Sequence, residues 1–152
     1  MTAALLSEKV IAERAEWIRK MLSAIRQVPL DTFEGFLSDS RNVAAAESYL
    51  RRALEALMDL GRHMLAKGFG MAASEYREIP RQLQAAGVLP VELAALMGTL
   101  AGYRNRMVHF YHDVTNQELY DICAHQLDDV EAVVGAMLAW VAAHPERVDR
   151  SL

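Results

Sequence analysis

The sequence predicts an all-α protein, an up-and-down bundle of four main helices and one short helix. Three observations support this fold class. Hydrophobic residues make up 53% of the chain and charged residues 24%, which is a globular balance. Helix breakers are scarce, with four prolines and eight glycines in 152 residues. Apolar residues recur every three or four positions through most of the chain, as in amphipathic helices.

The first helix is predicted from about Ala3 to Val28. Its apolar positions recur at three- and four-residue steps: Leu6, Val10, Trp17, Ile18, Met21, Leu22 and Ile25. That spacing places them on one face of a helix. Pro29 then ends the helix, because proline lacks the backbone N–H and clashes with the preceding turn.

A second long helix is predicted over residues 41–67, after a connector. Ser38 or Ser40 can cap its first turn. Gly68 follows it, where helix ends favour a left-handed backbone. A short helix is then predicted from about Tyr76 to Ala86.

The last two main helices flank a break in the chain. Pro90 opens the first of them, and Asp113-Val114-Thr115 ends it. Thr115 and Glu118 match a capping box, so one last long helix is expected to begin near Asn116. The long helices carry more apolar surface than one small bundle buries, which predicts a homodimer.

Length, charge and cysteine content narrow the function classes. We expect a single domain over residues 1–152, because neither a linker nor a repeat is visible. The net charge of −4 argues against broad, nonspecific nucleic-acid binding but leaves room for a local basic site. The longest uncharged run, Ala132 to Ala143, is too short to span a bilayer, so no membrane association is expected. A single cysteine favours a cytoplasmic location.

The stretch from Leu100 to Val114 departs from ordinary amphipathic helix. Two arginines, two histidines, an asparagine and two tyrosines lie in the ten residues from Tyr103 to His112. Asn105 and His109 are four apart and share a helix face. Arg104 and His109 diverge by about 140° on a straight helix. They can share a site only if the helix ends or distorts here, or if a second subunit supplies a partner copy.

These residue types suit cleavage of RNA without a metal ion. Histidine moves protons near neutral pH, and the planar charge of arginine can hold two phosphate oxygens. The 2′-hydroxyl of RNA then serves as nucleophile. Arg104 and His109 are therefore candidate catalytic residues, although on residue types alone they can also be an exposed arginine and a capping histidine at a helix end. Asn105 either orients His109 or the phosphate, or bonds a neighbouring loop. Arg106 and His112 are candidate substrate-binding residues.

Other basic and aromatic residues carry weaker signals. A local basic patch is formed by Arg104, Arg106, His109 and His112. The second long helix can add either Arg51 and Arg52 or Arg62 and His63 to it. Tyr103 lies on another face of the helix and is interpreted as a packing residue.

The last helix carries possible metal ligands at three- to four-residue steps: Asp121, His125, and Asp128 or Asp129. No second helix completes a di-iron pattern. We therefore interpret these residues as a solvated face and expect no metal and no cofactor. Cys123 has no activating partner nearby in sequence and is predicted to be an ordinary buried thiol.

The segment Arg104-Asn105-Arg106-Met107-Val108-His109 resembles the Arg-(polar)-x-x-x-His motif of HEPN-domain ribonucleases. With Phe110 and Tyr111 it becomes Arg-Asn-x-x-x-His-x-Tyr, the version typical of HepT toxins from HepT/MntA toxin–antitoxin pairs. The looser resemblance in helix layout covers about Leu6 to Trp140. The resemblance to HepT toxins implies a HEPN-like bundle and an endoribonuclease toxin. Its Arg-x4-His site would be composed across a homodimer. The resemblance also implies an MntA-like nucleotidyltransferase antitoxin that adds AMP to Tyr111.

Two alternatives are open at this point. Tyr111 can instead stack a base or be buried with its hydroxyl satisfied. The whole chain can also be a noncatalytic helical module that serves a nucleotidyltransferase partner or holds a nucleotide. Toxicity of the chain expressed alone supports only the ribonuclease.

Overall fold

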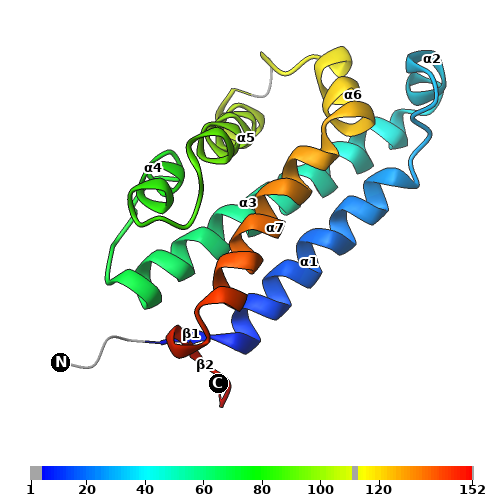
Figure 1. The fold of residues 1–152 in the computed structure, drawn as a ribbon. Helices are drawn as coiled ribbons and strands as arrows, with labels where there is room; N and C mark the ends of the chain where they lie inside the picture. Colours follow the sequence, from blue (N-terminus) through cyan, green and yellow to red (C-terminus); the bar gives the residue numbers. More distant parts are fainter. Residues whose placement is uncertain (1–4, 111–112, 152) are drawn as a thin grey trace.

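The computed structural model describes residues 5–110 and 113–151, and this part of the chain is mostly helical (Figure 1). The elements in chain order are β1 (Leu6–Ser7), α1 (Glu8–Arg26), α2 (Phe33–Leu37), α3 (Ser40–Phe69), α4 (Glu78–Ala85), α5 (Val91–His109), α6 (Asn116–His125), α7 (Leu127–Ala143), η2 (Pro145–Arg147) and β2 (Val148–Asp149). The predicted all-α bundle is confirmed.

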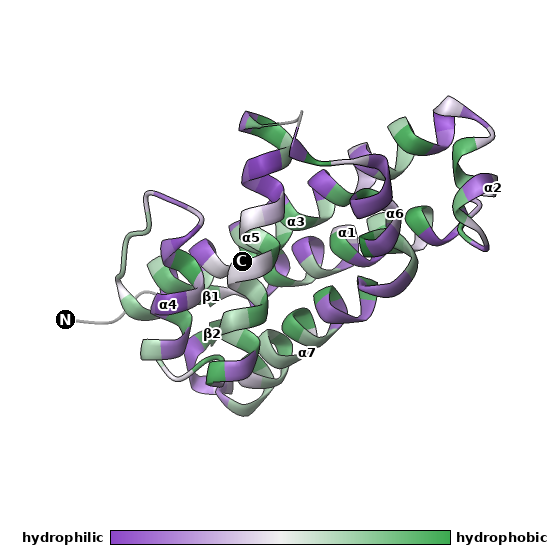
Figure 2. Ribbon diagram, turned by 90° about the horizontal axis from the view of Figure 1, so that it is seen from above, coloured by the Kyte–Doolittle hydropathy of each residue, from purple (hydrophilic) through white to green (hydrophobic). Residues whose placement is uncertain are grey.

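The central element is α3, which contacts each of the other α-helices. Its most extensive neighbour is α1, and the two long helices lie side by side (Figure 1). On another side of α3, α4 and α5 pack against each other. One continuous hydrophobic core joins the helices, while hydrophilic residues gather toward the last turns of α5 (Figure 2).

The first helix begins later than predicted, at Glu8. Residues 6 and 7 instead form a parallel pair with residues 148 and 149 of β2. The Ser7 hydroxyl then accepts a hydrogen bond from the Val10 N–H, which caps α1. Trp17, predicted to be buried, is 41% exposed. The buried face of α1 runs through Ile11, Ala15, Ile18, Met21, Leu22 and Ile25.

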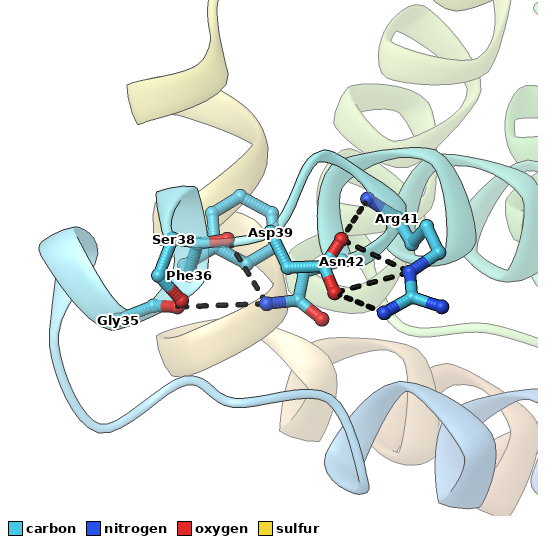
Figure 3. A network of polar contacts seen from close by, with 6 residues as sticks. All are labelled: Gly35, Phe36, Ser38, Asp39, Arg41 and Asn42. Carbon is cyan, nitrogen blue, oxygen red and sulfur yellow. Dashed lines mark hydrogen bonds and ion pairs between the residues drawn. The ribbon is translucent and has the colours of Figure 1, made fainter.

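Asp39 caps α3 (Figure 3). Neither Ser38 nor Ser40 has the predicted capping role. The Asp39 carboxylate accepts a hydrogen bond from the Arg41 N–H at 2.9 Å and pairs with the Arg41 guanidinium at 2.7 Å. These bonds lower the pKa of Asp39 to about 2. An ionised cap suits the positive end of the helix dipole.

The side-chain amide of Asn42 ties α2 to the first turn of α3 (Figure 3). It donates to the backbone carbonyls of Gly35 and Phe36, at 3.5 and 3.2 Å. The short helix is thereby fixed against the long one.

The C-terminus of α3 lies beyond the predicted end at Gly68. Gly70 is the residue with the left-handed backbone, at φ 64°. Gly68 lies inside the helix and is buried under Leu6; a Cβ there would lie 3.3 Å from the Leu6 side chain. Earlier in α3, a Cβ on Gly61 would lie 2.6 Å from Ile79 Cγ2. The absence of a side chain at Gly61 therefore lets α4 pack close to α3.

The predicted last long helix is two helices, α6 and α7. The backbone at Gln126 leaves the helical region, with φ −122° and ψ 9°. Tertiary contacts favour the break: the Tyr120 hydroxyl donates to the Leu30 carbonyl at 2.9 Å, and its ring packs on Phe33 and Phe36. These contacts hold α6 against α2, whereas α7 packs along α5.

The helix that follows Pro90 ends earlier than predicted, at His109 and not at Asp113-Val114-Thr115. Three other predicted features agree with the structure. The short helix α4 lies within the predicted range, and α5 begins directly after Pro90. The Thr115 hydroxyl accepts from the Glu118 N–H at 3.1 Å and caps α6. No helix in residues 5–110 and 113–151 is both long and apolar enough to cross a membrane.

Candidate functional site

The end of α5 lines a pocket of about 430 Å³. Its lining residues come from α3, the α3–α4 loop and the end of α5: Arg62, Ser74, Glu75, Tyr76, Arg77, Arg104, Asn105, His109 and Phe110. The helix ends at His109, and the backbone at Phe110 is no longer helical, with φ −135° and ψ 49°. Arg104 and His109 thus line one pocket of a single chain, at the point where the helix ends.

The Arg104 side chain is held by three groups and is only 20% exposed. Its Nε lies 3.4 Å from Glu55 Oε1, close enough for an ion pair but not aligned for a hydrogen bond. Its Nη1 donates to Asn105 Oδ1 at 3.2 Å. The guanidinium carbon lies 4.6 Å from the centre of the Tyr76 ring. A guanidinium fixed in this way is ready to bind an anion without further ordering.

Among the described residues, Asn105 hydrogen-bonds the arginine of the motif and no neighbouring loop. Its carbonyl oxygen accepts from Arg104, and the residue also lines the pocket beside His109. His109 is exposed. Phe110, at the rim, is 60% exposed, and its ring centre lies 6.5 Å from that of His109. The pocket therefore offers a proton-transfer group, a cation and an open aromatic surface together.

Tyr76 is a pocket residue that the sequence analysis did not single out as functional. Its hydroxyl donates to Asp59 Oδ1 at 3.2 Å. The guanidinium carbon of Arg62 lies 5.0 Å from its ring centre, so the ring contacts both Arg62 and Arg104. Burial, and then the negative charge of Asp59, raise the pKa of Tyr76. The phenol therefore stays neutral and keeps the proton that it donates.

The acidic partners of Arg104 and Tyr76, Glu55 and Asp59, form a pattern on α3 that the sequence shows but that is not specific. Glu55 and Asp59 are four residues apart and so share one face of the helix. An acidic pair on a predicted helix usually marks a solvated face. Only the structure shows that Arg104 from α5 and Tyr76 from the loop reach it.

Arg106 has a different partner. It forms a two-pronged ion pair with Glu118 of α6, with N···O distances of 2.6 and 2.9 Å, and also donates to the Asp113 carbonyl. The hydrogen bond to Glu118 raises the pKa of Arg106. This arginine joins α5 to α6 and is not among the residues that line the pocket. Tyr111 and His112 lie outside the described residues.

The remaining basic candidates divide between the pocket and other surfaces. Arg62 lines the pocket. Arg51 pairs with Glu55 at 3.3 Å and so shares a carboxylate with Arg104. His63 accepts the Ser7 N–H at 3.3 Å and belongs to the β1 contact instead. Tyr103 packs against the core, as predicted.

Within the described ranges, no group of three His, Cys, Asp or Glu side chains is placed to hold a metal ion. The acidic residues of α6 and α7 make surface contacts: Asp121 accepts from Gln117, and Asp128 lies 3.6 Å from Arg26. Cys123 is buried, and burial raises its pKa to about 12. It is an unreactive core thiol, as predicted.

Comparison with known proteins points to one family. A curated relative, tRNA nuclease HepT of Aphanizomenon flos-aquae (strain 2012/KM1/D3), is 25% identical over 111 residues, which cover 73% of this chain and 76% of the relative. Among solved structures, a tri-AMPylated Shewanella oneidensis HEPN toxin in complex with MNT antitoxin superposes with a TM-score of 0.78. That match has 21% identity and covers 87% of this chain and 98% of the toxin.

A cytosolic protein of unknown function from Bacillus subtilis, YutE, has the same fold. Its TM-score is 0.73 at 19% identity, and the match covers 93% of this chain and 94% of the other. Residues 11–137 match the family described as ribonuclease HepT-like. That match spans most of the chain, from α1 into α7, and includes the whole of α5 with its Arg-x4-His motif. The chain therefore belongs to the ribonuclease HepT-like family.

Proposed function

We propose that this protein is the toxin of a toxin–antitoxin pair, a cytoplasmic endoribonuclease that cleaves RNA without a metal ion. The observation that carries the proposal is the pocket in which Arg104, Asn105 and His109 lie together at the end of α5. Family membership supports the reaction class, since the curated relative is a tRNA nuclease. Transfer RNA is accordingly the first substrate to test.

The proposed reaction is transfer of the phosphodiester to the neighbouring 2′-oxygen. His109 accepts the proton of the 2′-hydroxyl while that oxygen bonds to phosphorus. The bond from phosphorus to the 5′-oxygen breaks, and the leaving oxygen takes up a proton from water. His109 then returns its own proton to the solvent. Arg104 neutralises the charge that builds on the phosphate oxygens. The products are a 2′,3′-cyclic phosphate and a 5′-hydroxyl.

The surroundings of the pocket fit a nucleotide. The lining holds three arginines, Arg62, Arg77 and Arg104, against one carboxylate, that of Glu75. The exposed ring of Phe110 offers a surface for a base. Arg106, which does not line the pocket, and His112 are kept as proposed RNA contacts. For this role Arg106 has to exchange Glu118 for a phosphate.

The proposed partner is an MntA-like nucleotidyltransferase antitoxin. Support comes from the similar Shewanella toxin, which was solved tri-AMPylated and in complex with MNT antitoxin. Tyr111 is the proposed acceptor, because it stands at the tyrosine of the Arg-Asn-x-x-x-His-x-Tyr motif. An AMP unit would bring a phosphate and a base next to the catalytic motif.

Expression of the chain alone and with its partner tests this function. We expect growth arrest and RNA breakdown on expression alone, and normal growth when a cognate nucleotidyltransferase is co-expressed. The competing assignment is a noncatalytic module that holds a nucleotide in the arginine-lined pocket. Harmless expression with intact RNA would favour that module.

We also propose that the protein is a homodimer that packs through α5. A single chain already supplies both Arg104 and His109 to the pocket, so their angular separation no longer requires a second subunit. The proposed homodimer is supported instead by an open face of α5, at Gly98 and Gly102. A Cβ on Gly98 or Gly102 would meet no atom of residues 5–110 and 113–151 within 4 Å. At about 100° per residue these glycines share a sector with Asn105 and His109. A second copy on this face would adjoin the pocket.

The substitution Gly102→Trp tests the dimer. A tryptophan on this face should block close approach of two α5 helices and give a monomer, as measured by light scattering at micromolar concentration. Gly135→Trp on α7 is the matched control, because a Cβ at Gly135 also meets no atom within 4 Å. The control should stay dimeric. A monomeric wild-type protein, or a dimeric Gly102→Trp variant, would contradict this interface.

A further inference from the structure

We propose that Tyr76 is a positioning residue for Arg104, holding its guanidinium plane in the orientation that the substrate phosphate needs. The catalytic consequence rests on the ribonuclease function proposed above. Tyr76 belongs to the loop between α3 and α4, outside the Arg-x4-His motif. It is partly buried and lines the same pocket as Arg104 and His109.

The aromatic ring of Tyr76 supports the guanidinium group of Arg104. The guanidinium carbon of Arg104 lies 4.6 Å from the Tyr76 ring centre, well within the range of a cation–π contact. Arg104 belongs to α5 and Tyr76 to the loop, so this contact crosses two separate parts of the fold. On the remaining sides, Glu55 and Asn105 contact the Nε and Nη1 atoms. The aromatic face thus restrains the plane of the group, and the two polar partners restrain its rotation within that plane.

Two sets of contacts hold the Tyr76 side chain in place. The Tyr76 hydroxyl donates to Asp59 of α3 at 3.2 Å. Arg62 lies 5.0 Å from the same ring, donates to the Ala73 carbonyl at 3.1 Å and lies 3.7 Å from Asp59. Arg62 thereby ties the loop to α3 just before Tyr76. A loop residue held in this way has the fixed orientation that a positioning role requires.

Two substitutions separate the ring from the hydroxyl. Tyr76→Phe keeps the aromatic face and loses only the bond to Asp59, so Arg104 should stay in place. Tyr76→Leu keeps apolar bulk but removes the face. Because small misplacements of catalytic groups can cost on the order of 100-fold in rate, we expect Tyr76→Leu to lower kcat by roughly tenfold to 100-fold. KM should change much less, because the charge of Arg104 is retained.

The test combines cleavage kinetics with NMR of the arginine side chains. In the wild-type protein the Arg104 Nε–Hε signal should be displaced by the ring current of Tyr76. The displacement should persist in Tyr76→Phe and vanish in Tyr76→Leu. Tyr49→Leu is the matched control: Tyr49 packs against the core and is not among the residues that line the pocket. It should alter thermal stability and leave kcat and the Arg104 signal unchanged.

The outcomes distinguish this inference from the proposed function. A folded wild-type protein that cleaves no RNA overturns the ribonuclease, and the NMR signal still decides whether Tyr76 holds Arg104. A wild-type protein that cleaves RNA, with a Tyr76→Leu variant of equal kcat or an unmoved Arg104 signal, overturns the positioning role. Loss of activity in Tyr76→Leu together with a shifted Arg104 signal and a normal Tyr76→Phe supports it.

Discussion

His109→Ala and Arg104→Ala should each abolish RNA cleavage while leaving the fold intact. His109 is exposed at the end of α5, and Arg104 borders the pocket rather than the core, so neither truncation opens a cavity in the bundle. Loss of a proton-transfer group costs about 10²–10⁴-fold in rate. Loss of a charge that stabilises the transition state costs about 10²–10³-fold. Purified variants incubated with a tRNA pool, with products resolved on gels, measure both losses.

Matched controls give this prediction its force. His125→Ala removes a histidine of α6 that contacts the Tyr120 ring, and Arg81→Ala removes an exposed arginine of α4; neither residue lines the pocket. Both should cleave like the wild-type protein. Circular dichroism should show the same helix content in all four variants. Full activity in His109→Ala or Arg104→Ala would place the chemistry elsewhere.

Tyr111→Phe should escape neutralisation by the antitoxin. The change keeps the ring but removes the hydroxyl that accepts AMP. In the unaltered protein each AMP unit adds a phosphate that competes with RNA for Arg104 and Arg106, and a base that takes up the space of a substrate nucleotide. Co-expression with a cognate nucleotidyltransferase should therefore restore growth to the wild-type strain but not to the Tyr111→Phe strain.

Tyr103→Phe is the control for this experiment. It also removes one tyrosine hydroxyl, but Tyr103 packs against the core. This variant should be neutralised normally. Mass spectrometry of the co-expressed wild-type protein should locate AMP on Tyr111. An unmodified Tyr111 beside full neutralisation would mean that the antitoxin inhibits by binding alone.

The helices and the motif could be predicted because their signals are local. The periodicity of apolar residues places α3, Pro90 marks the start of α5, and Thr115 with Glu118 fixes the start of α6. Long-range packing decided the points that differ. Gly68 resembles a helix end in sequence, but Leu6 packs on it and the left-handed residue is Gly70. The helix breaks at Gln126 because α6 contacts α2, and no residue near Gln126 predicts that break.

The same distinction applies to the site. The sequence brought Arg104, Asn105 and His109 together because they are neighbours on one helix and carry a recognisable pattern. It could not supply Glu55, Asp59 and Tyr76, since these act only through the packing of α3 and the α3–α4 loop against α5. It also gave no sign that Arg106 forms an ion pair with Glu118.

The most direct test of the central claim is the chemistry of the cut in the presence of EDTA. Purified protein should cleave a tRNA or RNA oligonucleotide without added metal and leave a 2′,3′-cyclic phosphate and a 5′-hydroxyl. An oligonucleotide with a 2′-deoxy residue at the cleaved position should stay intact, because the 2′-hydroxyl is the nucleophile. Strict dependence on magnesium, a 3′-hydroxyl product, or cleavage of the 2′-deoxy substrate would contradict a mechanism based on Arg104 and His109.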